Sequence, residues 1–482
     1  MRPPLRTLGA NVDPSRRRSF VALCAACCLA GCAATAPGTG GGGSSSNASG
    51  AGRGAAGAAA ASAAPAAPAG AAGTTASAAS ITTAAVHARA LEQVPAVLES
   101  LKALVAIESG SRDLEGLERI AALVAGRLAA AGMAVQTLPA QAPSFNPQLK
   151  GAKVGPMVMA RKAGTGKRRV LLIAHMDTVY PRGMGARQPF RVEGDRAYGL
   201  GISDDKGGVA LILHTVELLE RMRFTDYAEL AALINGDEEI GSAGSAQTIT
   251  RLGREYDAVF SFEGGGFERD MVRLATGSIA SVALRVKGKA SHAGAAPERG
   301  RNALVEMAHQ VLKTRGFGED DKGLTINWTV ATAGQVRNVI PADAVAHADV
   351  RALDDADLDR LEARLRQAIK DKLIPDTEVT LEFTRGRPAF RANAASRVLA
   401  QHARAIFKEM GLPLEIRDRA SGGGTDAAYA GIDPKGGVLE SFGLRGFGAH
   451  SGDEYVFISS IAPRLALAAR MVMDVGSGKL DW

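Results

Sequence analysis

The sequence predicts an α/β protein with a mostly parallel sheet, into which a smaller α+β domain is inserted. Between residues 86 and 276, short continuous apolar runs alternate with segments of helical apolar spacing, which is the pattern of a parallel sheet covered by helices. Residues 277–388 combine strand-like segments with two helices, which predicts a separate small domain. Helical spacing returns in residues 389–482, which would complete the first domain.

Each element of the first domain is predicted from its apolar pattern. Spacing typical of helices occurs at 94–109, 117–133 and 208–222. Continuous apolar runs typical of buried strands occur at 168–179, 229–239 and 257–265. Ligand sites of parallel sheets lie at the carboxyl ends of the strands, so the polar residues at these ends are expected to share one site. They are His175, Glu238, Glu239 and Glu263.

The inserted domain and the end of the chain follow in the same way. Strands are expected at 280–294, 325–334 and 344–354, and helices at 302–315 and 357–373. The chain then returns with a helix at 396–412, a glycine-rich loop at 421–429 and a last helix at 461–475.

Residues 1–32 have the layout of an export signal, because three arginines at 16–18 precede a short apolar run that ends in small residues. The segment before Cys32 resembles a lipobox, in which Cys32 would be lipidated and attach the protein to a membrane. The arginine pair resembles a twin-arginine signal. Residues 33–85, nearly all small or proline, predict a flexible linker. We expect a periplasmic or membrane-anchored protein; a disordered tail with chance cysteines is the alternative.

The formal net charge of +7 does not indicate a nucleic-acid partner. Residues 1–32 contain five Arg and one Asp, a net +4 of that charge, and no concentrated basic patch follows. All four cysteines lie in the same segment, so the rest of the chain has neither a disulfide nor a cysteine metal ligand. No later stretch is apolar over enough residues to span a membrane.

Imidazole and carboxylate side chains follow one another at strand ends and glycine turns, which predicts a two-metal hydrolase site. Zinc binds both ligand types, and a shared carboxylate bridges paired ions. Asp177 lies two residues after the first histidine, so strand alternation places it where it can orient the imidazole. The expected metal ligands are His175, Asp204, Glu239, Glu263 and His450.

Five motifs resemble the two-zinc aminoacylase and carboxypeptidase family, most closely its folate-hydrolysing glutamate carboxypeptidases. They are GKASHAGAAPE, RNVIPADA, RGRPAF, GGGTDAAY and the loop around His450. The resemblance implies two Zn²⁺ per subunit, with Asp204 bridging them. It assigns His175 and Glu263 to one ion and Glu239 and His450 to the other. It also implies a cis peptide between Asp204 and Asp205, and it makes Glu238 the general base that moves a proton from water to the leaving amine.

The resemblance further implies a homodimer in which His292 reaches the partner's site and stabilises the oxyanion; otherwise the inserted domain would have to close for the enzyme to be active. Asn338 and Arg387 would bind the substrate carboxylate, for which an arginine fork is suited. Arg385 is a second candidate for this role, although it could equally be a surface charge. The Gly422–Gly424 loop would let backbone approach the substrate. From the residues alone, His292 is more often structural, and such a loop is more often a generic flexible loop.

One departure from the family pattern concerns the substrate. The family's glutamate carboxypeptidases have a lysine for the substrate side chain where this chain has Met271, and Arg273 lies two residues on. We expect an exported zinc carboxypeptidase that cleaves a C-terminal, glutamate-like residue from an acyl or peptidyl group. The alternatives are an N-acyl amino acid hydrolase (aminoacylase or deacetylase) or a dipeptidase of the same family, and a non-catalytic solute-binding lipoprotein.

Overall fold

The computed structural model describes residues 81–140, 153–319, 323–420 and 423–482. The expected export signal and the linker up to residue 80 lie outside the described residues, as does Gly422. The first helix, α1 (Thr83–Glu92), begins inside the segment expected to be linker. Thr82 caps it by accepting a hydrogen bond from the Ala85 amide, and Val86 and Ala90 are buried in the core. Three of the ten residues of α1 are buried, Thr83, Val86 and Ala90, which are too few for a sequence pattern to mark this boundary.

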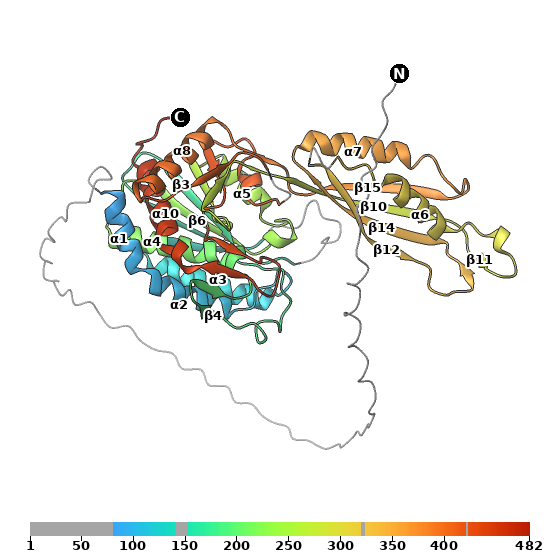
Figure 1. Cartoon of the computed structure of the whole chain (residues 1–482), viewed down its shortest axis with the longest axis horizontal. Helices are drawn as coiled ribbons and strands as arrows, with labels where there is room; N and C mark the ends of the chain where they lie inside the picture. Colours follow the sequence, from blue (N-terminus) through green and yellow to red (C-terminus); the bar gives the residue numbers. More distant parts are fainter. Residues whose placement is uncertain (1–80, 141–152, 320–322, 421–422) are drawn as a thin grey trace, which may run out of the picture. The chain divides into compact units, whose positions relative to one another are not determined.

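The central sheet has six strands in the order β1-β2-β6-β3-β7-β18. Figure 1 shows two of them, β3 and β6, among the helices of the first domain. Strands β6, β3, β7 and β18 are parallel, whereas β1 and β2 add an antiparallel edge. The predicted fold class is therefore confirmed, with an edge hairpin that the sequence pattern did not reveal. The strands are β1 (Ala134–Leu138), β2 (Met157–Ala163), β3 (Arg169–His175), β6 (Glu229–Asn235), β7 (Ala258–Ser261) and β18 (Gly437–Leu439).

Helices cover both faces of this sheet because both faces of its strands are apolar. In β3, Val170 and Leu172 belong to one buried cluster, and Leu171 and Ile173 to another. The larger cluster is completed by α1, α2 (Val94–Val105), α3 (Leu114–Ala130), α4 (Gly207–Arg221), α8 (Ala394–Glu409) and α10 (Ile461–Gly476). The smaller cluster is completed by α5 (Ala246–Gly253) and α9 (Ala427–Ala430).

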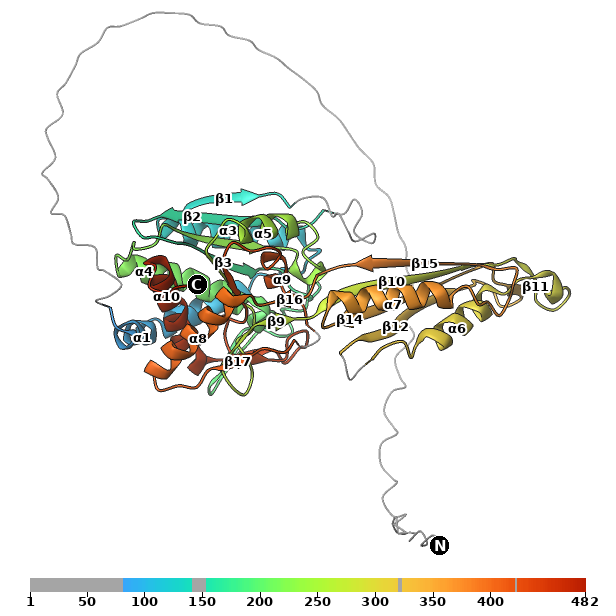
Figure 2. The same cartoon turned by 90° about the horizontal axis from the view of Figure 1, so that it is seen from above.

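A separate four-stranded antiparallel sheet, in the order β12-β14-β10-β15, forms the small domain. Val282, Leu284 and Val286 alternate along β10 and are buried beneath two helices, while the intervening residues face away. Figure 2 shows the two helices against the strands. The elements are β10 (Ser278–Lys287), β12 (Thr325–Ala333), β14 (Asp343–Ala352), β15 (Glu378–Arg385), α6 (Ala303–Thr314) and α7 (Asp355–Ala368).

Short strand pairs position the loops around the candidate site. A second four-stranded sheet comprises β4 (Arg191–Glu193), β5 (Arg196–Tyr198), β19 (Gly446–Phe447) and β20 (Tyr455–Phe457). Three two-stranded pairs join β8 (Met271–Arg273) to β17 (Glu415–Arg417), β9 (Ala275–Thr276) to β16 (Phe390–Arg391), and β11 (Ser291–His292) to β13 (Val339–Ile340). Among the described residues, every helix is too short or too polar to cross a bilayer.

Candidate metal centre

Two histidines face the two oxygens of one carboxylate. His175 ends β3, and its Nε2 lies 3.0 Å from Asp204 Oδ1. His450 lies in the loop between β19 and β20, and its Nε2 is 3.3 Å from Asp204 Oδ2. Asp204 itself lies in a π-helical turn just before α4, where the Asp204–Asp205 peptide is cis, as predicted. Asp204 is thus placed between the two imidazoles, which is the arrangement a bridging ligand requires.

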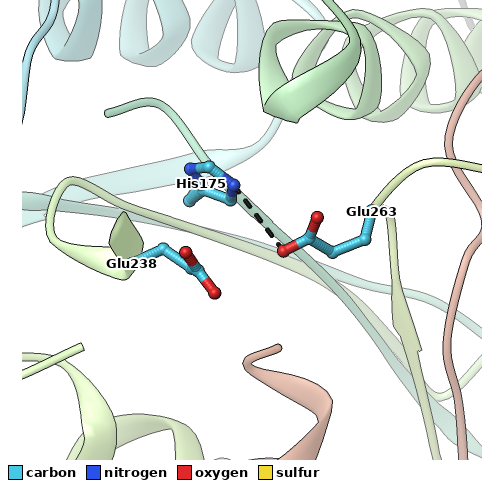
Figure 3. A group of neighbouring side chains, drawn as sticks. All are labelled: His175, Glu238 and Glu263. Carbon is cyan, nitrogen blue, oxygen red and sulfur yellow. Dashed lines mark ion pairs between the residues drawn. The ribbon is translucent and has the colours of Figure 1, made fainter. Parts of the chain in front are cut away.

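Three glutamates complete two groups of ligand atoms. Glu238 and Glu239 lie on a single 3₁₀ turn after β6, and Glu263 follows β7. Glu263 Oε1 is 3.6 Å from His175 Nε2, and Glu239 Oε2 is 3.1 Å from His450 Nε2. Figure 3 shows the side chains of His175, Glu238 and Glu263 converging on one point. The ligand atoms of this group lie within 4.8 Å of one another, as do those of Asp204, Glu239 and His450.

Asp177 orients both the histidine and the glutamate turn. It is fully buried, and its Oδ1 lies 3.3 Å from His175 Nδ1. Its two oxygens accept hydrogen bonds from the backbone amides of Glu238 (3.0 Å) and Glu239 (3.1 Å). Ser111 Oγ donates a further hydrogen bond at 2.7 Å. One buried carboxylate therefore fixes the imidazole and both acidic residues. The strand spacing in the sequence predicts its contact with the histidine but not its contacts with the two glutamates.

The electrostatics of the group fit a pair of divalent cations. Burial is the largest cause of the pKa shifts of the three glutamates. It raises the pKa of Glu238 to about 8 and also raises the pKa values of Glu239 and Glu263. Hydrogen bonds to Asp204 and Glu239 raise the pKa of His450 to about 10. Glu239 Oε1 is buried and lacks a hydrogen-bond partner among the described residues. A bound cation would satisfy this oxygen. Nitrogen and carboxylate donors in this number suit zinc.

The backbone at His450 supports the same conclusion. Its φ is 64°, a left-handed conformation that residues other than glycine seldom adopt. Such strain persists where the surrounding structure determines it, and it occurs most often at functional sites.

Arg387 lies against the predicted base rather than alone in the cavity. Its Nη1 is 2.5 Å from Glu238 Oε1, and its Nη2 donates to the Glu238 carbonyl and to Ser242 Oγ, both at 2.9 Å. Nη1 also donates to the Gly424 carbonyl. The Nε atom is buried without a partner among the described residues. Arg387 lines a cavity of about 710 Å³ together with Asp204, the three glutamates, Arg273 and His450.

The other predicted substrate contacts lie elsewhere. Arg385 pairs with Asp359 and Glu362 of α7 and does not line the cavity, in agreement with its alternative interpretation as a surface charge. His292 and Asn338 are neighbours, since the Ala293 amide donates to the Asn338 carbonyl, but neither lines the cavity. His292 follows the far end of β10, and Asn338 precedes β14, whose Asp343 pairs with Lys287 at that same end. The ten residues of β10 span roughly 30 Å from the cavity end at Ser278.

Glu454 is the residue whose importance the sequence did not reveal. It is 1% exposed, and its carboxylate accepts hydrogen bonds from the loop that holds Asp204. Its position in the GAHSGDE motif, four residues after His450, was the only signal that could have indicated it.

The comparisons with known proteins agree with this geometry. The sequence profile of "Peptidase family M20/M25/M40" matches residues 171–474. The chain belongs to this family. It is 44% identical over 391 residues to Carboxypeptidase G2 of Pseudomonas sp. (strain RS-16), covering 81% of this chain and 92% of that protein. It is 29% identical over 323 residues to succinyl-diaminopimelate desuccinylase of Methylobacterium radiotolerans, covering 63% of this chain and 80% of that protein.

The fold is shared more widely than the sequence. The di-peptidase Dug1p from Saccharomyces cerevisiae superimposes with a TM-score of 0.66 at 15% identity, covering 83% of this chain and 99% of Dug1p. A likeness at this identity concerns the fold alone. The M20/M25/M40 match and the similarity to Carboxypeptidase G2 make this chain a metallopeptidase, and so a hydrolase.

Proposed function

We propose that this metallopeptidase is an exported two-zinc carboxypeptidase that hydrolyses the amide bond between a C-terminal, glutamate-like residue and an acyl or peptidyl group. The observation that carries the proposal is the pair of ligand groups meeting at Asp204, with Glu238 directly beside them. The substrate class is supported by the 44% identity to Carboxypeptidase G2 over most of both chains.

Each ion has a distinct set of protein ligands in this proposal. His175 and Glu263 would hold one zinc, Glu239 and His450 the other, and Asp204 would bind both. Zinc at these positions would supply Lewis acidity, which would lower the pKa of water and polarise the scissile carbonyl. Two observations support this assignment: the buried Glu239 Oε1 has no hydrogen-bond partner in the described part of the chain, and two histidines face one carboxylate.

Glu238 moves the proton. Its side chain is almost fully buried and lies in the group with His175 and Glu263, so its carboxylate can accept a proton from the attacking water and return it to the leaving amine. Arg387, at 2.5 Å from Glu238 Oε1, favours the ionised form that accepts this proton. Asp177 holds the Glu238 amide and so fixes where the base lies.

Arginine side chains in the cavity account for an anionic substrate. Arg387 and Arg273 both line it, and a guanidinium binds a carboxylate through two parallel hydrogen bonds. Binding a substrate carboxylate at Arg387 would require some of its present contacts with Glu238, Ser242 and Gly424 to be exchanged. Arg273 would serve the side-chain carboxylate in place of the lysine that Met271 replaces.

The test is a substrate panel on the purified enzyme. Release of glutamate from N-acyl- and α- or γ-linked glutamate compounds is compared with release from the matching aspartate and neutral compounds. We expect kcat/KM to be highest for the glutamate compounds. Cleavage of N-acetylated amino acids without cleavage of any glutamate compound would instead contradict the proposal and favour the alternative of an N-acyl amino acid hydrolase.

A substitution at the base separates catalysis from binding. In Glu238→Gln, kcat should fall about 10²- to 10⁴-fold because proton transfer is lost, and two zinc equivalents should remain by metal analysis. Glu193→Gln, at an exposed position of β4, is the matched control and should behave as the unaltered enzyme. Hydrolysis that survives Glu238→Gln would refute the assignment of the base.

We propose a homodimer in which each subunit completes its partner's site. His292 Nδ1 accepts hydrogen bonds from the Gly294 and Ala295 amides at 3.1 and 3.0 Å, which assigns the imidazole proton to Nε2. That exposed N–H is a suitable donor to an oxyanion, and Asn338 lies beside it. Exposed apolar side chains on α6 and β12, such as Leu312 (62% exposed) and Val330 (54%), support a contact between subunits through the small domain.

We also propose that residues 1–32 export the enzyme and that Cys32 carries a lipid. The support is the order of arginines, apolar run and cysteine in the sequence. Metabolic labelling with an alkyne fatty acid should label the full-length protein, and Cys32→Ser should abolish the label. Export without a label would leave the twin-arginine interpretation and exclude the lipid.

A further inference from the structure

Glu454 links the two loops that hold the ligands of one proposed zinc. It lies four residues after His450, at the end of the same loop, directly before β20. Its side chain crosses to the turn that carries Asp204, where it meets backbone amides. No other described side chain has hydrogen bonds to the amides of both Ser203 and Asp204.

Both oxygens of this carboxylate are fully used. Oε1 accepts hydrogen bonds from the amides of Ser203 (2.7 Å) and Asp204 (3.0 Å). Oε2 accepts from the Gly201 amide (2.8 Å) and from the hydroxyl of Tyr180 (2.7 Å). Hydrogen bonds from N–H groups to a carboxylate are roughly twice as strong as neutral ones. Four donors around a side chain that is 1% exposed leave it one position and one orientation.

The turn that these bonds hold has an unusual backbone. Gly201 has a φ of 72°, and the residues after it form the π-helical turn in which Asp204 and Asp205 leave helical geometry. Donation by three amides to Glu454 keeps this turn in place, because they are amides that precede α4 and lack a helical acceptor. The direction of the Asp204 carboxylate toward His175 and His450 follows from the same turn.

We propose that Glu454 is a positioning residue that sets Asp204 relative to His450 and thereby the zinc affinity of the group Asp204–Glu239–His450. The inference rests on the proposed two-zinc function. Glu454 touches neither substrate nor metal in this account; it acts through the backbone of one ligand and through the loop of another. Partners of metal ligands typically change metal affinity 10- to 100-fold when substituted.

The test is zinc binding by the full-length enzyme, measured by competition with a chromophoric chelator. Glu454→Gln keeps the shape of the side chain but turns an N–H₂ group toward backbone N–H donors, which removes one acceptor. We expect one of the two zinc equivalents to bind about 10- to 100-fold more weakly, with the other unchanged. At limiting zinc kcat should fall while KM stays constant, and saturating zinc should restore kcat.

Glu306→Gln is the matched control. Glu306 is fully buried in the small domain, and its carboxylate also accepts hydrogen bonds, from the Ile374 amide (2.6 Å) and Gln310 Nε2 (2.7 Å). This substitution should lower thermal stability without changing either zinc affinity. A purely structural role for Glu454 would make the two variants alike, whereas a positioning role changes zinc affinity only in Glu454→Gln.

Zinc binding separates a failure of the proposed two-zinc function from a failure of the role assigned to Glu454. Unaltered enzyme that binds fewer than two zinc ions would refute the proposed function, independently of Glu454. If it binds two and Glu454→Gln binds both with unchanged affinity, the positioning role is wrong. Should Glu454→Gln fail to fold, Tyr180→Phe decides: it removes the hydroxyl that lies 2.7 Å from Glu454 Oε2 and 2.8 Å from the Ser451 carbonyl, both in the segment that holds His450, and we expect several-fold weaker binding of the same zinc equivalent. Unchanged affinity in Tyr180→Phe would then overturn the inference.

Discussion

Buried carboxylates that reach no substrate organise the ligand segments of this site. Asp177 joins the end of β3 to the turn of Glu238 and Glu239, and Glu454 joins the turn of Asp204 to the loop of His450. An ionised carboxylate accepts several hydrogen bonds, so one side chain can fix two chain segments that are remote in sequence. The ligands are consequently positioned by backbone hydrogen bonds as well as by packing.

Asp177→Asn tests this at the residue scale. The amide nitrogen would face either the backbone N–H groups of Glu238 and Glu239 or the hydroxyl of Ser111, and the imidazole of His175 would lose a carboxylate partner. We expect kcat and zinc affinity to fall about 10- to 100-fold. Isothermal titration with zinc and steady-state kinetics measure both. Ser111→Ala, which removes a single donor to Oδ2, should have a smaller effect; an equal effect would contradict the dominant role of the amides.

The ligand types were predictable because each lies at a strand end or a glycine turn, where the sequence records both the residue and its position. The contacts of Arg387 and Glu454 were not. Arg387 meets Glu238 across 149 residues, and Glu454 meets Asp204 across 250. Neither contact leaves a periodic pattern in the sequence, since each depends on how two loops are brought together by the folded sheet.

At the scale of elements, the long helices and buried strands followed from their apolar periods, whereas short strands did not. Strands β5 and β20 have three residues each, and their antiparallel pairing supports the loop that holds His450. Three residues are too few to show the alternation of apolar and polar side chains that marks a strand in the sequence. Such short strands form because tertiary contacts hold them. The edge strands β1 and β2 are longer, with five and seven residues, and the sequence pattern did not reveal them either.

The loop after β7 makes a testable prediction for an element. A Cβ on Gly265 would lie 2.3 Å from the Gly443 carbonyl oxygen and 2.6 Å from Cζ of the fully buried Arg464. Gly265→Ala should therefore destabilise the fold by about 1–3 kcal/mol and displace Glu263, two residues earlier, with loss of zinc. Urea unfolding and zinc analysis measure these effects.

Gly126→Ala provides a control of opposite sign. Gly126 lies within α3, and a Cβ there would meet no atom within 4 Å. The substitution should stabilise the protein by about 0.5–1 kcal/mol, because alanine loses less backbone entropy in a helix. If Gly265→Ala behaved like Gly126→Ala, the packing of Arg464 against the Glu263 loop would not matter for the site.

At the scale of the whole molecule, His214 should make stability depend on pH. It lies on α4 and is buried against α2 and α3, with Nδ1 3.0 Å from Gln93 Oε1 and Nε2 2.8 Å from Ser100 Oγ. Burial, the largest cause, lowers its pKa to about 4; nearby Arg127 and Arg221 lower it further and Glu217 opposes them. In the unfolded chain the pKa of this histidine is near 6.5, so the unfolded state binds more protons than the folded state between about pH 4 and 6.5. The free energy of unfolding therefore decreases as pH falls from about 6.5 to 4.

The expected loss is up to about 3 kcal/mol, from roughly two and a half pKa units. Urea unfolding of the unaltered protein and of His214→Gln across this range isolates the histidine from the carboxylates that also titrate. The slope of unfolding free energy against pH should be smaller in His214→Gln. Equal slopes in the two proteins would mean that His214 is protonated as readily when folded as when unfolded.

Complementation between two inactive variants tests the proposed dimer. In His292→Ala the site lacks the histidine donated by the partner, and in Glu238→Ala it lacks the base. A mixed dimer has one site with both groups, because the Glu238→Ala subunit still donates His292 to the other. If subunits pair at random, an equal mixture should regain roughly a quarter of full activity.

Leu312→Arg, at the exposed face of α6, should prevent this recovery and yield monomers by light scattering, whereas Leu91→Arg on α1, similarly exposed, should not. Recovery that is absent although the variants form mixed dimers would show that His292 acts within its own chain or not at all.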